Sequence, residues 1–140
     1  MSERLGIVVT GASSGIGAAL TVELAHDGHA LYICGRRERR LKEVASRSEN
    51  IRYRVCDVSD DGEVRRFADW VRTEAAQVDV LVNCAGAFGA LGRMWETDFV
   101  EWKKTIEVNL IGTYLMIKHV LPLIPRGGRA RIINFSGGGA

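Results

Sequence analysis

Short apolar runs alternate with longer segments of helical periodicity along this 140-residue chain, and this alternation restricts the fold more than any other feature. The apolar runs predict five strands, at 5–10, 30–35, 51–55, 78–83 and 131–136. The segments between them predict helices at 15–27, 37–47 and 60–76, and a long or broken helical stretch at 98–123. Such alternation is typical of βαβ units. We therefore expect an α/β fold with a doubly wound parallel sheet, strand order 3-2-1-4-5 and helices on both faces.

The charge pattern of two strands predicts where they lie in that sheet. In the third strand, Arg52 and Arg54 alternate with apolar residues, which is typical of a protected edge. The fifth strand contains Ile132, Ile133 and Phe135 and resembles an interior strand, yet the expected order places it at the other edge. We therefore expect something to cover it: a second copy, a complementary fragment, or further residues of a longer parent chain.

Composition places the chain among ordinary globular proteins. Hydrophobic residues make up 46% of it and charged residues 26%, and a net charge of +2 is too small to indicate nucleic acid or an anionic membrane as a partner. We expect one domain over 1–140, because this length is short for two hydrophobic cores. The longest apolar stretch, 110–124, is interrupted by Lys118 and His119, so we expect a soluble protein.

The three cysteines, Cys34, Cys56 and Cys84, lie at or just past the ends of predicted strands and form no C-x-x-C pair. We interpret them as small buried hydrophobic residues of a reduced, cytoplasmic protein. A metal site built from all three is the less favoured alternative, and no metal is expected.

A glycine-rich turn follows the first predicted strand and leads directly into an apolar-periodic helix. We expect Gly11 to allow a sharp exit from the strand, Gly15 to let backbone approach a pyrophosphate, and Gly17 to permit tight packing of helix against strand. Free N–H groups at a helix start attract anions, so the turn predicts a phosphate site, with a purely structural turn as the alternative. The residues expected to line this site are Gly11, Ser13, Ser14, Gly15, Ile16 and Gly17.

Further motifs fall where such a sheet binds ligands, outside the carboxyl ends of the strands. Arg36 and Asp57 follow the second and third strands, and Asn83-Cys84-Ala85-Gly86 follows the fourth. With the glycine turn and a later asparagine, these motifs resemble the short-chain dehydrogenase/reductase family over about 5–136. Cys84 is a mild departure from the family's usual Asn-Asn-Ala-Gly. The resemblance implies the Rossmann-like, dinucleotide-binding half of an oxidoreductase, truncated after strand five.

The resemblance also implies roles for single residues. The carboxylate of Asp57 meets the adenine amino group and Val58 flanks the ring. Asn83 ties strand ends together and contacts the cofactor, while Ala85 and Gly86 leave room for ribose and nicotinamide. Judged from the residues alone, Asp57 is equally well explained as a turn or cap residue.

The residues after the second strand decide which dinucleotide is expected. NAD-dependent enzymes of such folds carry an acid there for the ribose 2′-hydroxyl, whereas this chain has Arg36 and Arg37. A guanidinium offers a planar fork of donors to a 2′-phosphate, so we expect NADP(H) in preference to NAD(H). The family often has a basic residue where Ser14 stands, and its absence weakens that preference. Alternatives for the basic run 36–42 are a solvated helix start and, far less favoured, nucleic-acid binding.

The family's chemistry is hydride transfer to or from a carbonyl or alcohol, with a catalytic Tyr-x-x-x-Lys beyond strand five that this sequence does not contain. Asn109 matches an asparagine that holds a water of the proton relay, and a helix kink stabilised by its side chain is the alternative. Gly137 stands where the family has its catalytic serine, which leaves Ser136 as the candidate to replace it. Tyr114 and Lys118 have the pair's spacing but precede strand five, so we do not expect them to catalyse.

We therefore expect the dinucleotide-binding part of an NADP(H)-dependent oxidoreductase that acts on a small carbonyl or alcohol, with this chain inactive by itself. The alternative is a non-catalytic dinucleotide-binding module or redox-sensing subunit. Phe88, Leu91, Met94 and Trp95 suit an apolar substrate wall and equally suit packing. The helix around 114–121 is a dimerisation surface in the family, so we expect a homodimer or homotetramer.

Overall fold

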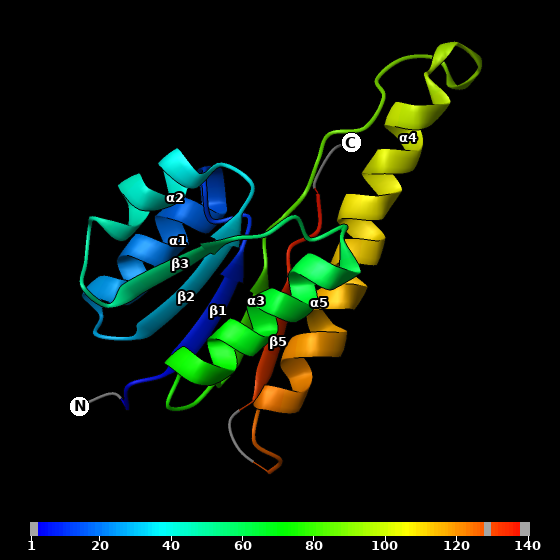
Figure 1. The fold of residues 1–140 in the computed structure, drawn as a ribbon. Coiled ribbons are helices and arrows are strands. Elements are labelled where there is room, and N and C mark those ends of the chain that lie inside the picture. Colours follow the sequence, from blue (N-terminus) through cyan, green and yellow to red (C-terminus); the bar gives the residue numbers. More distant parts are fainter. Residues whose placement is uncertain (1–2, 128–129, 138–140) are drawn as a thin grey trace.

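A computed structural model describes residues 3–127 and 130–137 of the chain. The strands form one parallel sheet in the order β3-β2-β1-β4-β5, which confirms the predicted fold class and topology (Figure 1). Their bounds are β1 (Gly6–Thr10), β2 (Ala30–Gly35), β3 (Ile51–Val55), β4 (Val80–Asn83) and β5 (Arg131–Asn134).

Three strands are shorter than the sequence predicted: β1 by one residue, and β4 and β5 by two residues each. At the start of β4, the Asp79 carboxylate accepts a hydrogen bond from the Gly6 N–H at 2.8 Å and the Asp79 N–H donates to the Gly6 carbonyl at 2.8 Å, and the regular strand begins one residue later, at Val80. At the end of β5, the Phe135 N–H donates to the Asn83 carbonyl at 3.2 Å, and regular pairing ends there. Apolar character alone did not reveal either boundary.

The helices connect these strands in the expected alternation. They are α1 (Gly15–His26), α2 (Glu38–Ala45), α3 (Asp61–Glu74), α4 (Phe99–Ile106) and α5 (Gly112–Val120), with short 3₁₀ segments at Met94–Glu96 and Leu121–Leu123. A π-helical turn, Glu107–Ile111, joins α4 to α5, so the predicted stretch at 98–123 is a helical run with an irregular turn inside it. No helix of the described ranges is both long and apolar enough to cross a membrane.

Side-chain caps start two of these helices where the sequence placed their beginnings. The Asp60 carboxylate accepts a hydrogen bond from the Glu63 N–H at 2.7 Å, at the first turn of α3. The Asp98 carboxylate does the same for the Glu101 N–H at 2.9 Å, at the first turn of α4. Each cap satisfies a backbone donor that has no partner within its helix.

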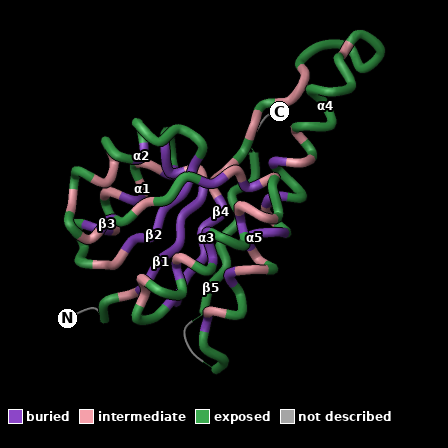
Figure 2. Tube along the Cα trace, in the orientation of Figure 1, coloured by how far each residue is buried: buried purple, intermediate pink, exposed green. Residues whose placement is uncertain are grey.

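Two hydrophobic clusters lie on opposite faces of the sheet. Ile7, Val9 and Leu31 point to the side that α1 and α2 cover, whereas Val8 and Tyr32 point to the side that α3 and α5 cover (Figure 1). Side chains alternate between the faces of a strand, so strands covered on both faces are apolar throughout. Figure 2 shows the result as buried inner strands beneath more exposed helices.

The two sheet edges differ as the sequence predicted. On β3, Arg52 and Arg54 are exposed, and Arg52 forms an ion pair with Glu74 of α3. On β5, Ile132 and Ile133 are exposed as well, 37% and 43%, and α4 projects away from the body of the sheet (Figures 1 and 2). The described residues therefore leave one apolar edge of the sheet and the projecting helix uncovered.

Candidate dinucleotide-binding site

One cavity of about 570 Å³ lies along the carboxyl edge of the sheet. Its wall brings together all the residues that the sequence singled out for a cofactor or for chemistry: Gly11, Ser13, Ser14, Gly15, Ile16, Gly17, Arg36, Arg37, Asp57, Val58, Asn83, Ala85, Gly86, Asn109 and Ser136. Residues without an earlier assignment also contribute to it, among them Cys56, Ala87, Val108, Thr113 and Phe135. The motifs thus converge on one cleft, between the ends of β1 and β4 where the strand order reverses.

The three glycines of the turn are required for three different reasons. Gly11 has a φ of 62°, and a Cβ there would lie 2.6 Å from the Ala85 nitrogen, so it permits contact with the segment after β4. A Cβ on Gly17 would lie 2.5 Å from the Gly11 oxygen, so it permits the start of α1 to pack on the turn. Gly15 has a φ of 57°, and a Cβ there would meet nothing within 4 Å. The space that a Gly15 side chain would occupy is therefore open, as expected at a position where a ligand approaches the backbone.

Thr10 joins the two sides of the cleft. It is buried at the end of β1, and its Oγ1 accepts hydrogen bonds from the Cys84 N–H at 3.2 Å and the Ala85 N–H at 3.0 Å. The sequence analysis gave Thr10 no role, although a hydroxyl at the end of an otherwise apolar strand is a signal for such a contact. Thr10 therefore fixes the segment after β4 against the glycine turn.

Asn83 presents an unsatisfied acceptor in the wall of the cleft. Its Nδ2 donates to the Oδ1 of Asn134 on β5 at 2.9 Å, which ties two strand ends together. Its own Oδ1 is buried and has no hydrogen-bond partner among the described residues. Leaving a buried acceptor unpaired costs about 1–3 kcal/mol, so a donor supplied by a ligand or water fits this position.

Asp57 lies two residues after β3, and its surroundings stabilise the ionised carboxylate. Burial raises its pKa, but hydrogen bonds from the Ser59 hydroxyl at 2.7 Å and the Ser59 N–H at 3.0 Å lower it, as do the positive charges of Arg36 and Lys104. The net effect is a pKa below the ordinary value. Both bonds from Ser59 engage Oδ1, which leaves Oδ2 without a hydrogen bond among the described residues, and Asp57 lines the cleft.

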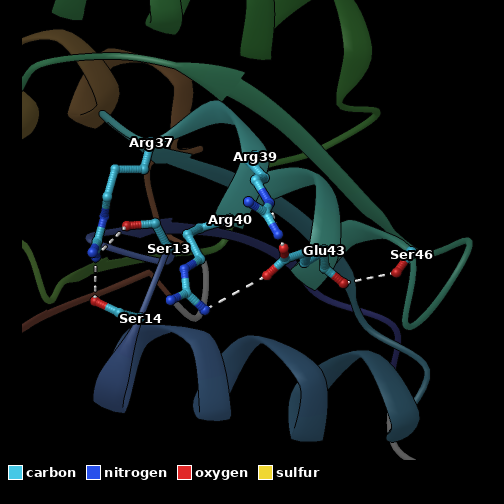
Figure 3. Close-up of polar contacts among 7 residues, drawn as sticks. All are labelled: Ser13, Ser14, Arg37, Arg39, Arg40, Glu43 and Ser46. Carbon is cyan, nitrogen blue, oxygen red and sulfur yellow. Dashed lines mark hydrogen bonds and ion pairs between the residues drawn. The ribbon is translucent and has the colours of Figure 1, made fainter.

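Two arginines follow β2 and face different parts of the cleft. Arg36 is exposed, and its charge acts on Asp57. Arg37 instead turns to the glycine turn, where its Nη2 donates to the Ser14 Oγ at 2.7 Å and the Ser13 Oγ at 3.2 Å (Figure 3). The end of β2 thus presents two cations and no carboxylate to the cleft.

Asn109 lies in the π-helical turn and holds the segment after β4. Its Oδ1 accepts from the Ala87 N–H at 2.7 Å and its Nδ2 donates to the Ala87 carbonyl at 2.9 Å. Its own carbonyl accepts from the Thr113 hydroxyl at 2.9 Å. The Asn109 side chain therefore clamps the helical stretch to the wall of the cleft.

Three residues considered for chemistry take different positions. Ser136 lines the cleft beside Gly137. The Tyr114 side chain is 60% exposed and is absent from the cavity wall. Lys118 lies 3.6 Å from the Asp61 carboxylate on α3, away from the cleft. The structure therefore does not bring Tyr114 and Lys118 to the predicted cofactor residues.

The cysteines contribute no metal site within 3–127 and 130–137, where no group of three or more His, Cys, Asp or Glu side chains is arranged to hold a metal. Cys34 and Cys56 are buried, as interpreted from the sequence, and the hydrogen bond between their side chains together with burial raises the pKa of Cys34 well above its ordinary value. Cys84 is only partly buried in the wall of the cleft, and burial raises its pKa too. Raised pKa values make the thiols of Cys34 and Cys84 weak nucleophiles.

A glycine turn that leads into a helix, at the point where the strand order of a parallel sheet reverses, defines a Rossmann-like nucleotide-binding fold. The residues present fit a dinucleotide. The turn has open space at Gly15, and the cleft is lined by residues that follow each of the five strands. Asn83 adds a buried acceptor without a hydrogen-bond partner among the described residues.

Comparison with known proteins defines the family. The sequence matches the family model for short chain dehydrogenase over residues 6–140. An uncharacterized oxidoreductase of Staphylococcus saprophyticus is 37% identical over 134 residues, which cover 92% of this chain and 57% of that protein. The NADPH-dependent pterin aldehyde reductase of Arabidopsis thaliana is 28% identical over 135 residues, which cover 94% of this chain and 56% of that protein.

A solved structure agrees with these relatives. A variant of actinorhodin polyketide ketoreductase with NADPH has a TM-score of 0.83 and 32% identity, covering 96% of this chain and 54% of that one. The chain therefore belongs to the short-chain dehydrogenase family of oxidoreductases. It spans just over half the length of the relatives it matches.

Proposed function

We propose that this chain supplies the dinucleotide site of an NADP(H)-dependent oxidoreductase, which transfers hydride between nicotinamide and the carbonyl or alcohol of a small molecule. One observation carries the choice of cofactor: the cleft has Arg36 and Arg37 at the end of β2 and no carboxylate there. The names of an NADPH-dependent relative and of a similar structure with NADPH support it.

Each part of the cleft suits one part of this cofactor. The open face of Gly15 and the N–H groups at the start of α1 suit the pyrophosphate. Arg36 and Arg37, with the hydroxyls of Ser13 and Ser14, suit the 2′-phosphate. Bound NADPH supplies the hydride, and the protein's part is to bind and orient it.

The remaining residues are assigned to the two ends of the dinucleotide. The carboxylate of Asp57 accepts from the adenine amino group, and Val58 flanks the ring. Asn83, Ala85 and Gly86 receive the ribose and nicotinamide end.

For the chemical step, we assign two positions of the cleft. Ser136 holds the substrate oxygen by a hydrogen bond from its hydroxyl, and Asn109, which also clamps Ala87, supports a water of the proton relay. Among the described residues no tyrosine lines the cleft, and we assign the proton donor of the reaction to none of them.

Gly137 favours the second candidate, a dinucleotide-binding module or redox-sensing subunit that does not catalyse. A glycine cannot hold a substrate oxygen with a side chain, and it lies in the wall of the cleft next to Ser136. Binding without turnover by a full-length parent protein distinguishes this candidate from the oxidoreductase.

The remaining proposals concern the whole protein. We propose a single NADP(H)-binding domain over 1–140 in a cytoplasmic protein, with a small molecule as substrate and no nucleic acid, membrane or metal as partner. We also propose a homodimer or homotetramer, because α4, the π-helical turn and α5 expose large apolar residues such as Phe99, Leu110 and Tyr114.

Calorimetric titration with NADPH and NADH tests the choice of cofactor. A charge-assisted hydrogen bond to the 2′-phosphate contributes about 1.5–3 kcal/mol, so NADPH should bind roughly tenfold to a hundredfold more tightly. Arg36→Asp removes one cation and supplies an acceptor for a 2′-hydroxyl, so it should reverse the order. Equal affinities in the unmodified chain would contradict the proposal.

A further inference from the structure

The charged side chains of the cleft are confined to one end of it. Arg36, Arg37 and Asp57 follow β2 and β3, at the end assigned to the adenosine half of the cofactor. The other end, the substrate end, is lined by 83–88, 108–109, 113 and 135–137, and none of these described residues is an Asp, Glu, Lys or Arg. An ionised group loses its hydration in a cleft and needs an opposite charge to compensate for it. The substrate end therefore favours an uncharged ligand.

Most side-chain donors of the substrate end are already engaged. The Asn83 Nδ2 donates to a residue of β5, and the Asn109 Nδ2 donates to the Ala87 carbonyl. The Thr113 hydroxyl donates to the Asn109 carbonyl within the helical run. In the part of the chain that the structure describes, Ser136 has the one hydroxyl or amide side chain of this end that donates no hydrogen bond. One free donor suits a single carbonyl oxygen and does not suit a ligand with several acceptors.

Two phenylalanines line the same end of the cleft. Phe135 directly precedes Ser136, and its N–H donates to a backbone carbonyl at the end of β4 at 3.2 Å, so the two segments leave the sheet together (Figure 1). Phe88 directly follows Ala87, whose N–H and carbonyl are both held by the Asn109 side chain. Phe135 is 48% exposed and Phe88 is 97% exposed. Much of each aromatic ring is therefore free to contact a ligand.

Small residues keep the space around the free donor open. Ala85 and Gly86 follow β4, and Gly137 follows Ser136 in the wall of the cleft. A Cβ on Gly137 would meet no heavy atom of the described residues within 4 Å. A flat ring can therefore lie beside the Ser136 hydroxyl without displacing a side chain at position 137. Aromatic rings attract one another in offset and edge-to-face arrangements, which gives an aryl group an advantage over a saturated ring of the same size.

We propose that the substrate end selects an uncharged aryl ketone or aryl aldehyde, and that Phe135 is the specificity-determining residue. The Ser136 hydroxyl holds the one carbonyl oxygen, and the aromatic ring of the substrate packs against Phe135. Compounds that carry a carboxylate or phosphate are rejected because this end offers them no opposite charge. The inference rests on the proposed function and adds a substrate class to it.

Three matched ketones test this inference on the NADPH-loaded chain. Acetophenone has an uncharged aryl carbonyl, cyclohexyl methyl ketone replaces the aromatic ring by a saturated one, and para-acetylbenzoate adds a carboxylate. NADPH is the suitable form of the cofactor because its nicotinamide ring is uncharged, so the charge of the probe is met by the protein alone. Calorimetry first measures NADPH binding, and saturation-transfer NMR titrations then give the dissociation constant of each ketone.

The expected result is an order of affinities that depends on Phe135. Acetophenone should bind roughly twofold to tenfold more tightly than cyclohexyl methyl ketone, the range expected for one aromatic pair. It should bind about tenfold or more tightly than para-acetylbenzoate, whose carboxylate lacks a partner. Phe135→Leu keeps an apolar side chain and should remove most of the preference for the aromatic ring. Phe135→Lys supplies a cation and should place para-acetylbenzoate ahead of acetophenone.

Phe99→Leu is the matched control. Phe99 is 70% exposed on α4 and does not line the cleft, so this variant should leave all three affinities within about twofold of the unmodified chain. Unchanged NADPH affinity in each variant shows that the domain is folded and that the dinucleotide site is intact.

Several outcomes would overturn the inference. If NADPH binds and acetophenone either does not bind or binds no better than the other two ketones, the substrate class is wrong and the proposed dinucleotide site stands. If the preference for acetophenone survives Phe135→Leu, Phe135 does not determine it. If Phe99→Leu removes the preference instead, the ketones bind to the exposed apolar surface of α4. If the unmodified chain does not bind NADPH, the proposed function fails first.

Discussion

Glycine at positions 11, 15 and 17 illustrates how one residue type meets three demands within a single turn. Gly11 and Gly17 are needed because backbone atoms lie within 2.6 Å of where a Cβ would be, whereas Gly15 is needed for its positive φ and for the open space beside it. Packing therefore explains Gly11 and Gly17, and only at Gly15 would a side chain extend into the space proposed for the ligand. Substitutions at these positions should separate folding from binding.

Gly15→Val should abolish dinucleotide binding while the domain still folds. A branched side chain at Gly15 would fill the space proposed for the pyrophosphate, and the left-handed backbone would add roughly 1–3 kcal/mol of strain. Gly28→Val is a matched control, since Gly28 also has a positive φ, 91°, and open space around a Cβ, but lies outside the cavity wall. Both variants should lose similar stability in urea, and only Gly15→Val should lose NADPH in calorimetry. Retained binding in Gly15→Val would show that the turn is only structural.

Gly17→Ala should instead destabilise the fold. Its Cβ would lie 2.5 Å from the Gly11 oxygen, and overpacking of this kind costs about 1–3 kcal/mol. Gly62→Ala, in α3, is the comparison: a Cβ there meets only the ends of the Asp60 and Arg66 side chains, at 3.2 and 3.3 Å. Because Asp60 Oδ1 also caps α3, the helix propensity of alanine should offset part of the cost of displacing it, and the change should cost less than Gly17→Ala. Urea midpoints for both variants measure the difference, and equal midpoints would argue against the close packing at Gly17.

The sequence predicted the residues of the cleft better than their contacts. All the predicted site residues line one cavity, because strand ends and motif order place them there without any knowledge of side chains. The different directions of Arg36 and Arg37 could not be predicted, since neighbouring residues at a strand–helix junction diverge according to backbone angles. The hydrogen bonds that the Cys84 and Ala85 N–H groups donate to Thr10 Oγ1 also depend on pairing between strands that are far apart in sequence.

At the scale of elements, the helical run from α4 to α5 shows where periodicity stops being informative. Its apolar pattern predicted one long or broken stretch, which is correct, but not the π-helical turn at Glu107–Ile111. That turn is accompanied by a tertiary contact, the pair of hydrogen bonds between the Asn109 side chain and Ala87. Irregular turns within helices often lie at functional sites, and this one borders the cleft.

The packing of α3 against α5 should depend on pH through Asp61. The hydrogen bond with His119, at 2.8 Å, lowers the pKa of Asp61, with Lys118 adding to the effect and desolvation opposing it. Because the folded-state pKa is below the unfolded value of about 3.9, the ionised carboxylate stabilises the fold above that pH, and this contribution is lost as pH falls through the folded-state pKa.

Asp61→Asn should therefore lower the urea midpoint at pH 6, and the midpoints of the variant and the unmodified chain should converge as the pH falls below about 4. Asp69→Asn serves as a comparison, since Asp69 pairs with Arg72 inside α3 and connects no second helix. Parallel pH profiles for Asp61→Asn and the unmodified chain would show that the contact with His119 does not stabilise the packing of α3 on α5.

At the scale of the whole molecule, exposed apolar surface is concentrated on the side of the sheet that ends with β5. The core around β1, β2 and β4 is closed by helices on both faces, whereas β5 and the run from α4 to α5 are exposed (Figure 2). Along that run and the 3₁₀ segment after it, large apolar residues recur at helical spacing on the surface: Phe99, Trp102, Ile106, Leu110, Tyr114 and Leu121. This apolar stripe, which the exposed Lys118 interrupts between Tyr114 and Leu121, marks an interaction surface.

The 140-residue chain should associate with itself through this stripe. The helical run presents more large apolar side chains than β5, which is only four residues long and begins with Arg131. Replacing Leu110 and Tyr114, 65% and 60% exposed, by lysine in the double variant Leu110→Lys/Tyr114→Lys should therefore shift the chain to monomer in sedimentation velocity. Ile133→Lys, on β5, should leave most of the association in place, and Thr73→Lys, on the exposed surface of α3, controls for added charge.

Association that survives the double variant but disappears in Ile133→Lys would identify the edge of β5 as the contact, as expected for an unpaired strand. A monomer at all concentrations in the unmodified chain would contradict both contacts.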